Sequence, residues 1–214
     1  MVVVDGTYDC PPDTPHCHQG QMPFLTSLAE AAQRLRCLIT GAPPSFFDIG
    51  NTFSPGALDD DTLVDVAVAA GKRVNFVGDA TWGALLPSRF SEERSLPCFD
   101  VHDLHSVDSG VAAGLAEWLP RPEGWDVLIA HTLGVDHAGH AAGVNSALML
   151  AKLRQTDALV REWLEAMAAR AGAGEPYERT LALIFGDHGT DGLESRWAVP
   201  EVVVKFVSRM GCVR

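Results

Sequence analysis

Short apolar runs that end in acidic or histidine residues are the feature that most constrains the fold of this 214-residue chain. Asp5 follows Val2-Val3-Val4, His131 follows Val127-Leu128-Ile129-Ala130, and Asp187-His188 follow Leu183-Ile184-Phe185-Gly186. Amphipathic stretches separate these runs, which is typical of strands alternating with helices around a mostly parallel sheet. The carboxyl ends of such strands form one edge, where sites assemble. We therefore expect these polar side chains to converge.

The apolar pattern predicts four strands and four helices within a single domain that spans residues 1–214. The expected strands are residues 2–5, 73–77, 125–131 and 180–185, each apolar enough to be buried on both faces, as parallel strands are. The expected helices are residues 23–36, 59–70, 111–119 and 144–171. Gly172 and Gly174 mark the end of the last helix. Its predicted apolar stripe consists of Ala147, Leu148, Leu150, Ala151, Leu153, Ala158, Leu159, Trp163 and Leu164.

Charge and hydropathy exclude several classes of protein. Hydrophobic residues make up 47% of the chain and charged residues 21%, which is the balance of a globular protein. The net charge of −12 argues against nucleic acid or an anionic membrane surface as a partner. No apolar run approaches the ~20 residues of a transmembrane helix. The chain opens in an apolar run without the basic residues of a signal peptide, so we expect it to be part of a longer protein.

Asp136 and His140 are the first pair of candidate metal ligands. Side chains four residues apart on a helix face the same way, so this carboxylate and imidazole can bind one ion. Asp187 and His188 follow a strand between two glycines and present adjacent ligands, and Asp5 adds a third strand-end carboxylate. Taken singly, each motif is also compatible with a turn or a helix cap. Together they form a mixed oxygen and nitrogen set suited to a two-metal site for phosphoryl chemistry.

Other acidic, histidine and cysteine residues have plainer interpretations. The five cysteines match no zinc module by spacing, and Cys10, His16, Cys17 and His18 are interpreted as a surface loop, with metal binding as the alternative. Asp59-Asp60-Asp61 and Asp108 are interpreted as helix caps rather than metal ligands. His102 and His105 are either loop histidines or ligands.

The segment from Val127 to His140 closely resembles the GPI ethanolamine phosphate transferases, most of all those acting on the third mannose of the glycolipid anchor. The likeness continues outside the candidate ligands and distinguishes this family from the phosphodiesterases, sulfatases and cofactor-independent phosphoglycerate mutases of the same superfamily. The matching segments are Gln33-Arg34-Leu35-Arg36, Thr40-Gly41, Phe47-Asp48, Gly78-Asp79-Ala80-Thr81-Trp82, Phe99-Asp100-Val101-His102-Asp103-Leu104 and Val107-Asp108-Ser109-Gly110-Val111.

The resemblance implies an α/β fold, an alkaline-phosphatase-like α/β/α sandwich with a mostly parallel central sheet, partly truncated here. It implies an enzyme of GPI-anchor biosynthesis at the lumenal face of the endoplasmic reticulum membrane, with a multi-span membrane region absent from this sequence. Phosphoethanolamine passes from phosphatidylethanolamine to a mannose hydroxyl of the GPI precursor through a phospho-threonine. Two zinc ions are implied, with Asp136 and His140 on one ion and Asp5, Asp187 and His188 on the other.

Two departures from the family pattern bear on catalysis. The family has a Thr-rich stretch with the nucleophile ahead of Gln33, whereas this chain has Leu28-Ala29-Glu30-Ala31-Ala32, and only Thr26 and Ser27 stand nearby as substitutes. The family also has a further histidine after its Gly-Asp-His-Gly motif, whereas His188 is the last of the eight histidines here. His131 or His137 is the alternative third ligand. We expect a truncated sequence of an active enzyme or a catalytically impaired remnant of the family.

Overall fold

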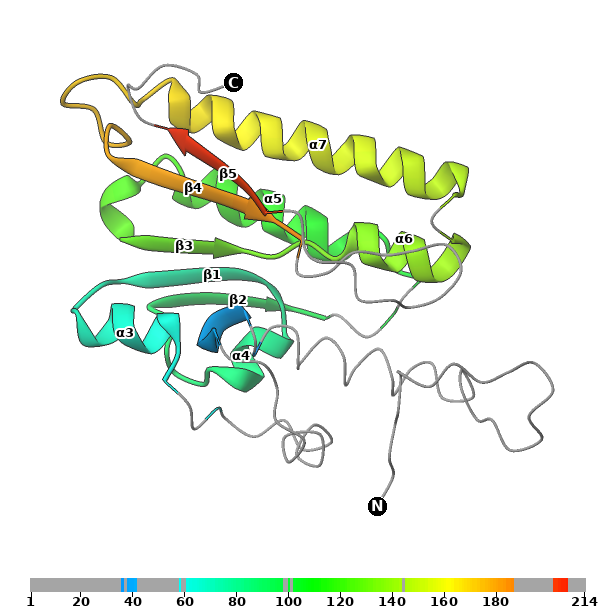
Figure 1. Ribbon diagram of the computed structural model, residues 1–214, viewed down its shortest axis with the longest axis horizontal. Coiled ribbons are helices and arrows are strands. Elements are labelled where there is room, and N and C mark those ends of the chain that lie inside the picture. Colours follow the sequence, from blue (N-terminus) through cyan, green and yellow to red (C-terminus); the bar gives the residue numbers. More distant parts are fainter. Residues whose placement is uncertain are drawn as a thin grey trace.

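Helices and strands alternate along most of the chain that the computed structural model describes (Figure 1). The described residues are 36, 38–41, 58, 61–97, 100, 102–143 and 145–186, together with the backbone of 202–207. The elements, in chain order, are α3 (Leu63–Ala69), β1 (Val74–Asp79), α4 (Thr81–Leu85), β2 (Glu92–Leu96), α5 (Ser106–Trp118), the 3-10 helix η1 (Pro122–Gly124), β3 (Val127–Ala130), α6 (Gly134–Ala142), α7 (Ala147–Ala168), β4 (Thr180–Phe185) and β5 (Val202–Val207).

A three-stranded parallel sheet in the order β2-β1-β3 lies at the centre of the described fold. Phe76 of β1 pairs with Glu93 of β2 and with Ile129 of β3. The expected strands 73–77 and 125–131 are confirmed, and with them the α/β class. The sequence analysis missed β2, because Glu92-Glu93-Arg94-Ser95-Leu96 has no apolar pattern and forms a largely exposed strand beside β1.

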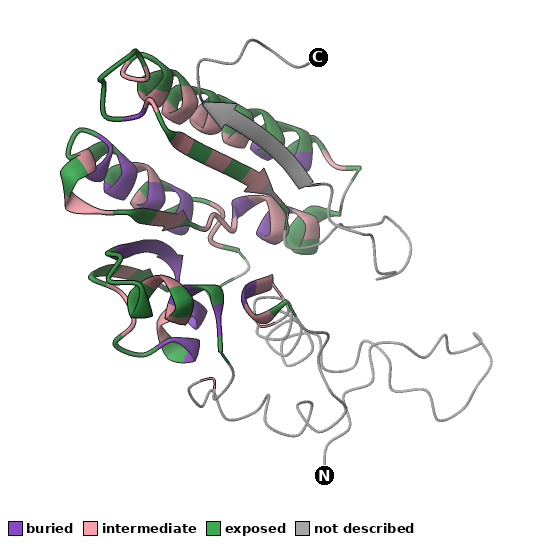
Figure 2. Ribbon diagram, turned by 60° about the vertical axis from the view of Figure 1, so that its left-hand side comes forward, coloured by how far each residue is buried: buried purple, intermediate pink, exposed green. Residues whose placement is uncertain are grey.

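The prediction for residues 180–185 is right about the strand and wrong about its environment. β4 pairs antiparallel with β5 in a separate two-stranded sheet. Leu181 and Leu183 are 50% and 54% exposed, and Figure 2 shows exposed and half-buried residues alternating along β4. β3 is also partly exposed, whereas every residue of β1 is buried. An apolar composition alone therefore did not distinguish a central strand from one that is open on one face.

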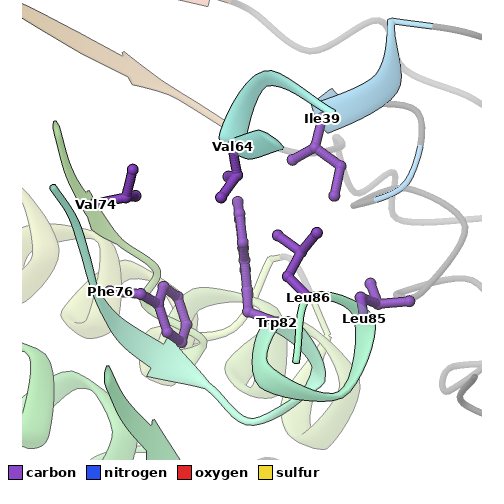
Figure 3. Close-up of a cluster of buried hydrophobic side chains, with 7 residues drawn as sticks. All are labelled: Ile39, Val64, Val74, Phe76, Trp82, Leu85 and Leu86. Atoms are coloured by element: carbon purple, nitrogen blue, oxygen red, sulfur yellow. The ribbon is translucent and has the colours of Figure 1, made fainter. Parts of the chain in front are cut away.

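Two hydrophobic clusters lie on opposite faces of β1, because successive residues of a strand point to opposite sides. Val74 and Phe76 face α3 and α4, and Val77 faces α5. Figure 3 shows the first cluster, in which the indole of Trp82 stands beside Phe76 with ring centroids 5.3 Å apart. The second cluster consists of Val77, Val107, Val111, Leu115, Trp118, Leu119 and Tyr177. Helices thus cover both faces of the parallel sheet, as an α/β/α arrangement requires.

Three of the four predicted helices, 59–70, 111–119 and 144–171, form within the described residues, with starts that depend on capping side chains. α3 begins after Thr62 rather than at the Asp59–Asp61 cluster, because Thr62 and Asp65 form a reciprocal capping box. α5 begins at Ser106, five residues earlier than expected, because Asp103 accepts hydrogen bonds from the N–H groups of His105 and Ser106. Asp59 and Asp60 lie outside the described residues.

The last predicted helix, residues 144–171, is confirmed as α7 (Ala147–Ala168), but its predicted apolar stripe is partly buried only in its later part, where Trp163 packs against the second cluster. Ser146 caps it by accepting a hydrogen bond from the N–H of Met149 at 3.0 Å. Met149 and Lys152 are buried, whereas Leu148, Leu150 and Leu153 of the predicted apolar stripe are exposed. Among the described residues, no helix is both long enough and apolar enough to cross a membrane.

The remaining predicted elements fall at the ends of the chain. The expected strand 2–5 lies outside the described residues. So does the expected helix 23–36, apart from Arg36, which is helical.

Candidate metal centre

The candidate centre lies where β3 ends and α6 begins, at the carboxyl edge of the parallel sheet. The N–H of His131 donates to the carbonyl of Val77 at 3.0 Å, which extends the pairing of β1 and β3 by one residue. Gly78 follows with a φ of +150°, and a Cβ there would lie 2.5 Å from the carbonyl oxygen of His131. Glycine therefore lets the ends of the two strands approach each other closely.

Asp136 and His140 lie on the same face of α6, as their spacing predicts. Oδ1 of Asp136 and Nε2 of His140 are 3.5 Å apart. Their side chains are 28% and 45% exposed, so both are partly open to solvent. A carboxylate oxygen and an imidazole nitrogen are both ordinary zinc ligands, and this pair fits as half of a tetrahedral set.

The remaining predicted ligands are not brought together by the described structure. Asp5, Asp187 and His188 lie outside the described residues, as do Cys10, His16, Cys17 and His18. Within the residues that are described, no group of three or more histidine, cysteine, aspartate or glutamate side chains could hold a metal ion. The two-metal site therefore stays a prediction. The structure describes the geometry of one part of it, the pair Asp136 and His140.

His137, which lies between Asp136 and His140 in the sequence, contacts the loop before α5. It is buried, and its Nδ1 lies 2.8 Å from the carbonyl oxygen of Asp103 in the loop before α5. Because a carbonyl only accepts, the imidazole must donate at Nδ1. This hydrogen bond anchors α6 to the loop, which favours a structural role for His137 over the third-ligand alternative.

His131 stands at the end of β3 with its Nδ1 already occupied. The indole N–H of Trp82, in α4, donates to this nitrogen at 3.1 Å. The preceding turn is held by Asp79, which is buried and accepts from the N–H and the hydroxyl of Thr81 at 2.7 and 2.8 Å. The Gly78–Trp82 segment, noted in the sequence only as a family match, therefore forms a turn that presents Trp82 to His131.

Asp108 and Lys152 form a buried ion pair beside the start of α6. Oδ2 of Asp108 and Nζ of Lys152 are 2.8 Å apart, and both side chains are 2% exposed. Oδ1 of Asp108 accepts from the N–H groups of Leu133 and Gly134, each at 3.0 Å. The sequence interpretation of Asp108 as a helix cap holds for a different helix, since Asp108 lies within α5 and caps α6. Lys152 was missed, because a lysine within an apolar helix pattern predicts an exposed side chain.

The loop before α5 contains Asp103, a carboxyl group with a strongly lowered pKa. The backbone N–H and the hydroxyl of Ser106 and the N–H of His105 lower the pKa of Asp103 from 3.8 to about 2. Asp103 is thus held as a carboxylate at the start of α5, where negative charge is favourable. His102 and His105 are exposed loop residues, and Nδ1 of His105 lies 3.2 Å from Nζ of Lys152.

The parallel sheet with helices on both faces and the Asp136–His140 pair at its carboxyl edge define the class of α/β proteins whose sites lie at the carboxyl ends of parallel strands. Comparison with known proteins is consistent with this class. Type I phosphodiesterase / nucleotide pyrophosphatase is the family that matches, over residues 29–204. The chain belongs to this family.

Curated relatives narrow the assignment. The chain is 41% identical over 157 residues to GPI ethanolamine phosphate transferase 3, catalytic subunit, of Homo sapiens, which covers 73% of this chain and 14% of that protein. It is 36% identical over 162 residues to GPI ethanolamine phosphate transferase 3 of Schizosaccharomyces pombe, covering 75% of this chain and 17% of that protein. It is 37% identical over 156 residues to GPI ethanolamine phosphate transferase 2, catalytic subunit, of Homo sapiens, covering 73% and 16%.

The predicted resemblance to the GPI ethanolamine phosphate transferases is therefore confirmed. The chain spans about a seventh of the length of the human relative of the third type.

Proposed function

We propose that this chain is the metal-binding part of a GPI ethanolamine phosphate transferase of the third type. The enzyme transfers phosphoethanolamine from phosphatidylethanolamine to a mannose hydroxyl of the GPI precursor, at the lumenal face of the endoplasmic reticulum membrane. The observation that carries this proposal is the α6 geometry within the matched region, with Asp136 and His140 3.5 Å apart at the sheet edge. Identity to the human type 3 relative, 41%, exceeds identity to the human type 2 relative, 37%, which supports the third type.

In this proposal the chain's own residues bind two zinc ions. Asp136 and His140 hold one, and Asp5, Asp187 and His188 hold the other. Zinc bound in such a site lowers the pKa of an attacking hydroxyl and neutralises charge on phosphoryl oxygens. Asp136 would contribute a negative charge and His140 a neutral nitrogen, and both side chains are partly exposed.

A second candidate function, a metal-binding remnant without turnover, is favoured by one specific observation. Covalent phosphoryl transfer needs an oxygen nucleophile beside the metals, and residues 28–32 supply no hydroxyl. Correct positioning of reacting groups contributes ~7–11 kcal/mol to lowering a barrier, so a displaced nucleophile loses most of the rate. We therefore propose that this chain keeps the family's fold and metal affinity but does not by itself transfer phosphoethanolamine.

Incubation of the full chain with labelled phosphatidylethanolamine and zinc tests the two candidates. We expect no covalent phosphoryl adduct and no labelled product. We expect both to appear in a variant that receives a Thr-rich family segment ahead of Gln33 and a histidine after His188. An adduct on Thr26 or Ser27 of the unaltered chain would show that it is an active transferase.

Zinc titration tests the metal site itself. Zinc binding is followed on the imidazole resonances of His140 or, in the His140→Gln variant, on the resonances of α6. We expect Asp136→Asn and His140→Gln each to weaken the zinc binding that these resonances report. Asp157→Asn is the matched control, because Asp157 forms an exposed i,i+4 ion pair with Arg161 on α7, of the same spacing as the Asp136–His140 pair. Equal zinc binding by all three variants would contradict the proposed site.

A further inference from the structure

Three helices meet at the first turn of α6. Asp108 comes from α5, Lys152 from α7 and Gly134 is the first residue of α6 itself. The carboxylate and the ammonium are 2.8 Å apart and almost fully buried. Nζ of Lys152 also donates to Oε1 of Gln155 at 3.1 Å and lies 3.2 Å from Nδ1 of His105. Because an ammonium only donates, Nδ1 of His105 must accept there.

Asp108 replaces the local cap that α6 lacks. Leu133 occupies the N-cap position and offers no side-chain hydrogen bond to the helix. The first N–H groups of a helix have no partner within the helix, and the helix dipole favours a negative charge beside them. Oδ1 of Asp108 meets both needs by accepting from the N–H groups of Leu133 and Gly134.

Gly134 leaves the space in which this contact is made. A Cβ at position 134 would overlap Cε of Lys152 and Oδ2 of Asp108, and would lie 2.5 Å from Nζ of Lys152. The lysine stem thus passes directly over the start of α6. The first turn of α6 is thereby held between a carboxylate that binds its N–H groups and a cation that fixes the carboxylate.

We propose that Asp108 and Lys152 are positioning residues for the phosphoryl-transfer site. They fix where α6 begins, and therefore where Asp136, two residues after Gly134, and His140, one turn later, present their metal-binding atoms. The inference rests on the proposed function of Asp136 and His140 as zinc ligands. Stability alone does not account for the pair, because apolar residues of similar size often replace a buried ion pair without loss. What Asp108 adds at this place is an acceptor oxygen that fixes the orientation of the helix start.

The test compares Asp108→Asn, Lys152→Met and the double variant in the full chain. Hydrogen exchange of the Leu133 and Gly134 amides reports the contact directly, and zinc titration followed on the His140 imidazole resonances reports its consequence. Each single variant leaves one buried charge without its partner. We expect zinc affinity at His140 to fall about 10–100-fold, the range seen when residues that orient metal ligands are changed. We expect exchange of the two amides to accelerate by at least about tenfold.

The double variant separates positioning from a failure to fold. Asparagine keeps an oxygen for the two amides, and methionine fills the space of the lysine side chain. The neutral pair leaves no unpaired charge, so both readouts should return to within about threefold of the unaltered chain. Asp157→Asn should change neither readout.

Three results would overturn the inference, each in a distinct way. Unchanged exchange at Leu133 and Gly134 in both single variants would show that Asp108 does not hold the helix start. Accelerated exchange with unchanged zinc affinity would leave the pair a structural role only. If the unaltered chain shows no zinc effect at His140 while exchange still responds to the variants, the proposed metal site is wrong, and the positioning role fails with it.

Discussion

The indole N–H of Trp82 donates a hydrogen bond to Nδ1 of His131 across 3.1 Å, and this bond joins the turn after β1 to the end of β3. Acceptance at Nδ1 places the proton of the neutral imidazole on Nε2. The ring of His131 also meets the indole edge-on, with centroids 6.2 Å apart. One side chain from α4 thus determines the orientation and tautomer of the histidine that precedes α6.

Replacing His131 tests this hydrogen bond. His131→Leu leaves the Trp82 N–H without its acceptor, which costs about 1–3 kcal/mol when the donor is buried. His131→Gln keeps an acceptor on a side chain of similar reach and should lose less. Urea unfolding of the two variants measures the difference in the free energy of unfolding. An equal loss in both would mean that the ring contacts, and not the hydrogen bond, stabilise this junction.

Gly134→Ala tests how closely Lys152 and Asp108 pack on α6. The added Cβ would overlap the lysine stem and the carboxylate, and overpacking of this kind costs about 1–3 kcal/mol. Gly124→Ala is the control, because a Cβ there meets no atom within 4 Å. Thermal or urea unfolding measures both variants. A Gly134→Ala chain as stable as the Gly124→Ala chain would mean that Lys152 can leave its position freely.

Asp103 predicts a pH dependence of stability. Its pKa in the folded chain is about 2, below the ordinary value of 3.8, because Ser106 and His105 donate hydrogen bonds to the carboxylate. A depressed pKa stabilises the folded state above the ordinary value, and this contribution is lost as the pH falls through about 2. Asp103→Asn should therefore destabilise the chain at neutral pH and have little effect near pH 2.

Asp103→Ala is the control for that pH dependence. Alanine removes the hydrogen-bond acceptor as well as the charge, so part of its destabilisation should persist near pH 2. Asp103→Asn should change the free energy of unfolding little at that pH. Urea unfolding at the two pH values measures both variants. A loss of stability of the same size at both pH values in Asp103→Asn would contradict the assignment of this stabilisation to the charge of Asp103.

Metal stoichiometry follows from the number of ligands in each predicted half-site. Asp5, Asp187 and His188 supply three protein ligands, whereas Asp136 and His140 supply two. Calorimetric titration with zinc should show one tight equivalent and a weaker one. Asp187→Ala should abolish the tight equivalent, because two remaining ligands hold an ion poorly. Two tight equivalents in the unaltered chain would mean that another side chain, with His131 or His137 as the candidates, completes the Asp136–His140 pair.

Much of the described fold could be predicted from local sequence. The β-branched runs at 73–77 and 125–131 form parallel strands because such residues fit a buried sheet. Asp136 and His140 lie side by side because a helical turn brings residues four apart together. The family resemblance was visible in motifs such as Gly78–Trp82, whose role as a turn that presents Trp82 to His131 emerged only in the structure. The convergence of Asp5, Asp187 and His188 on one metal ion stays a prediction.

Tertiary contacts decided what local pattern could not. Residues 148–153 predicted a helix that buries leucines, but α7 buries Met149 and Lys152 and leaves Leu148, Leu150 and Leu153 exposed. Lys152 can be buried because the carboxylate of Asp108, 44 positions earlier in the chain, supplies a counter-charge that no local rule can include. By itself the sequence determined the helices α3, α5 and α7, the strands β1, β3 and β4, and the spacing of the Asp136–His140 pair. The packing of α5 against α6 and α7 decided which side of α7 is buried and where α6 begins, because a lysine can be buried only where a partner charge is already in place.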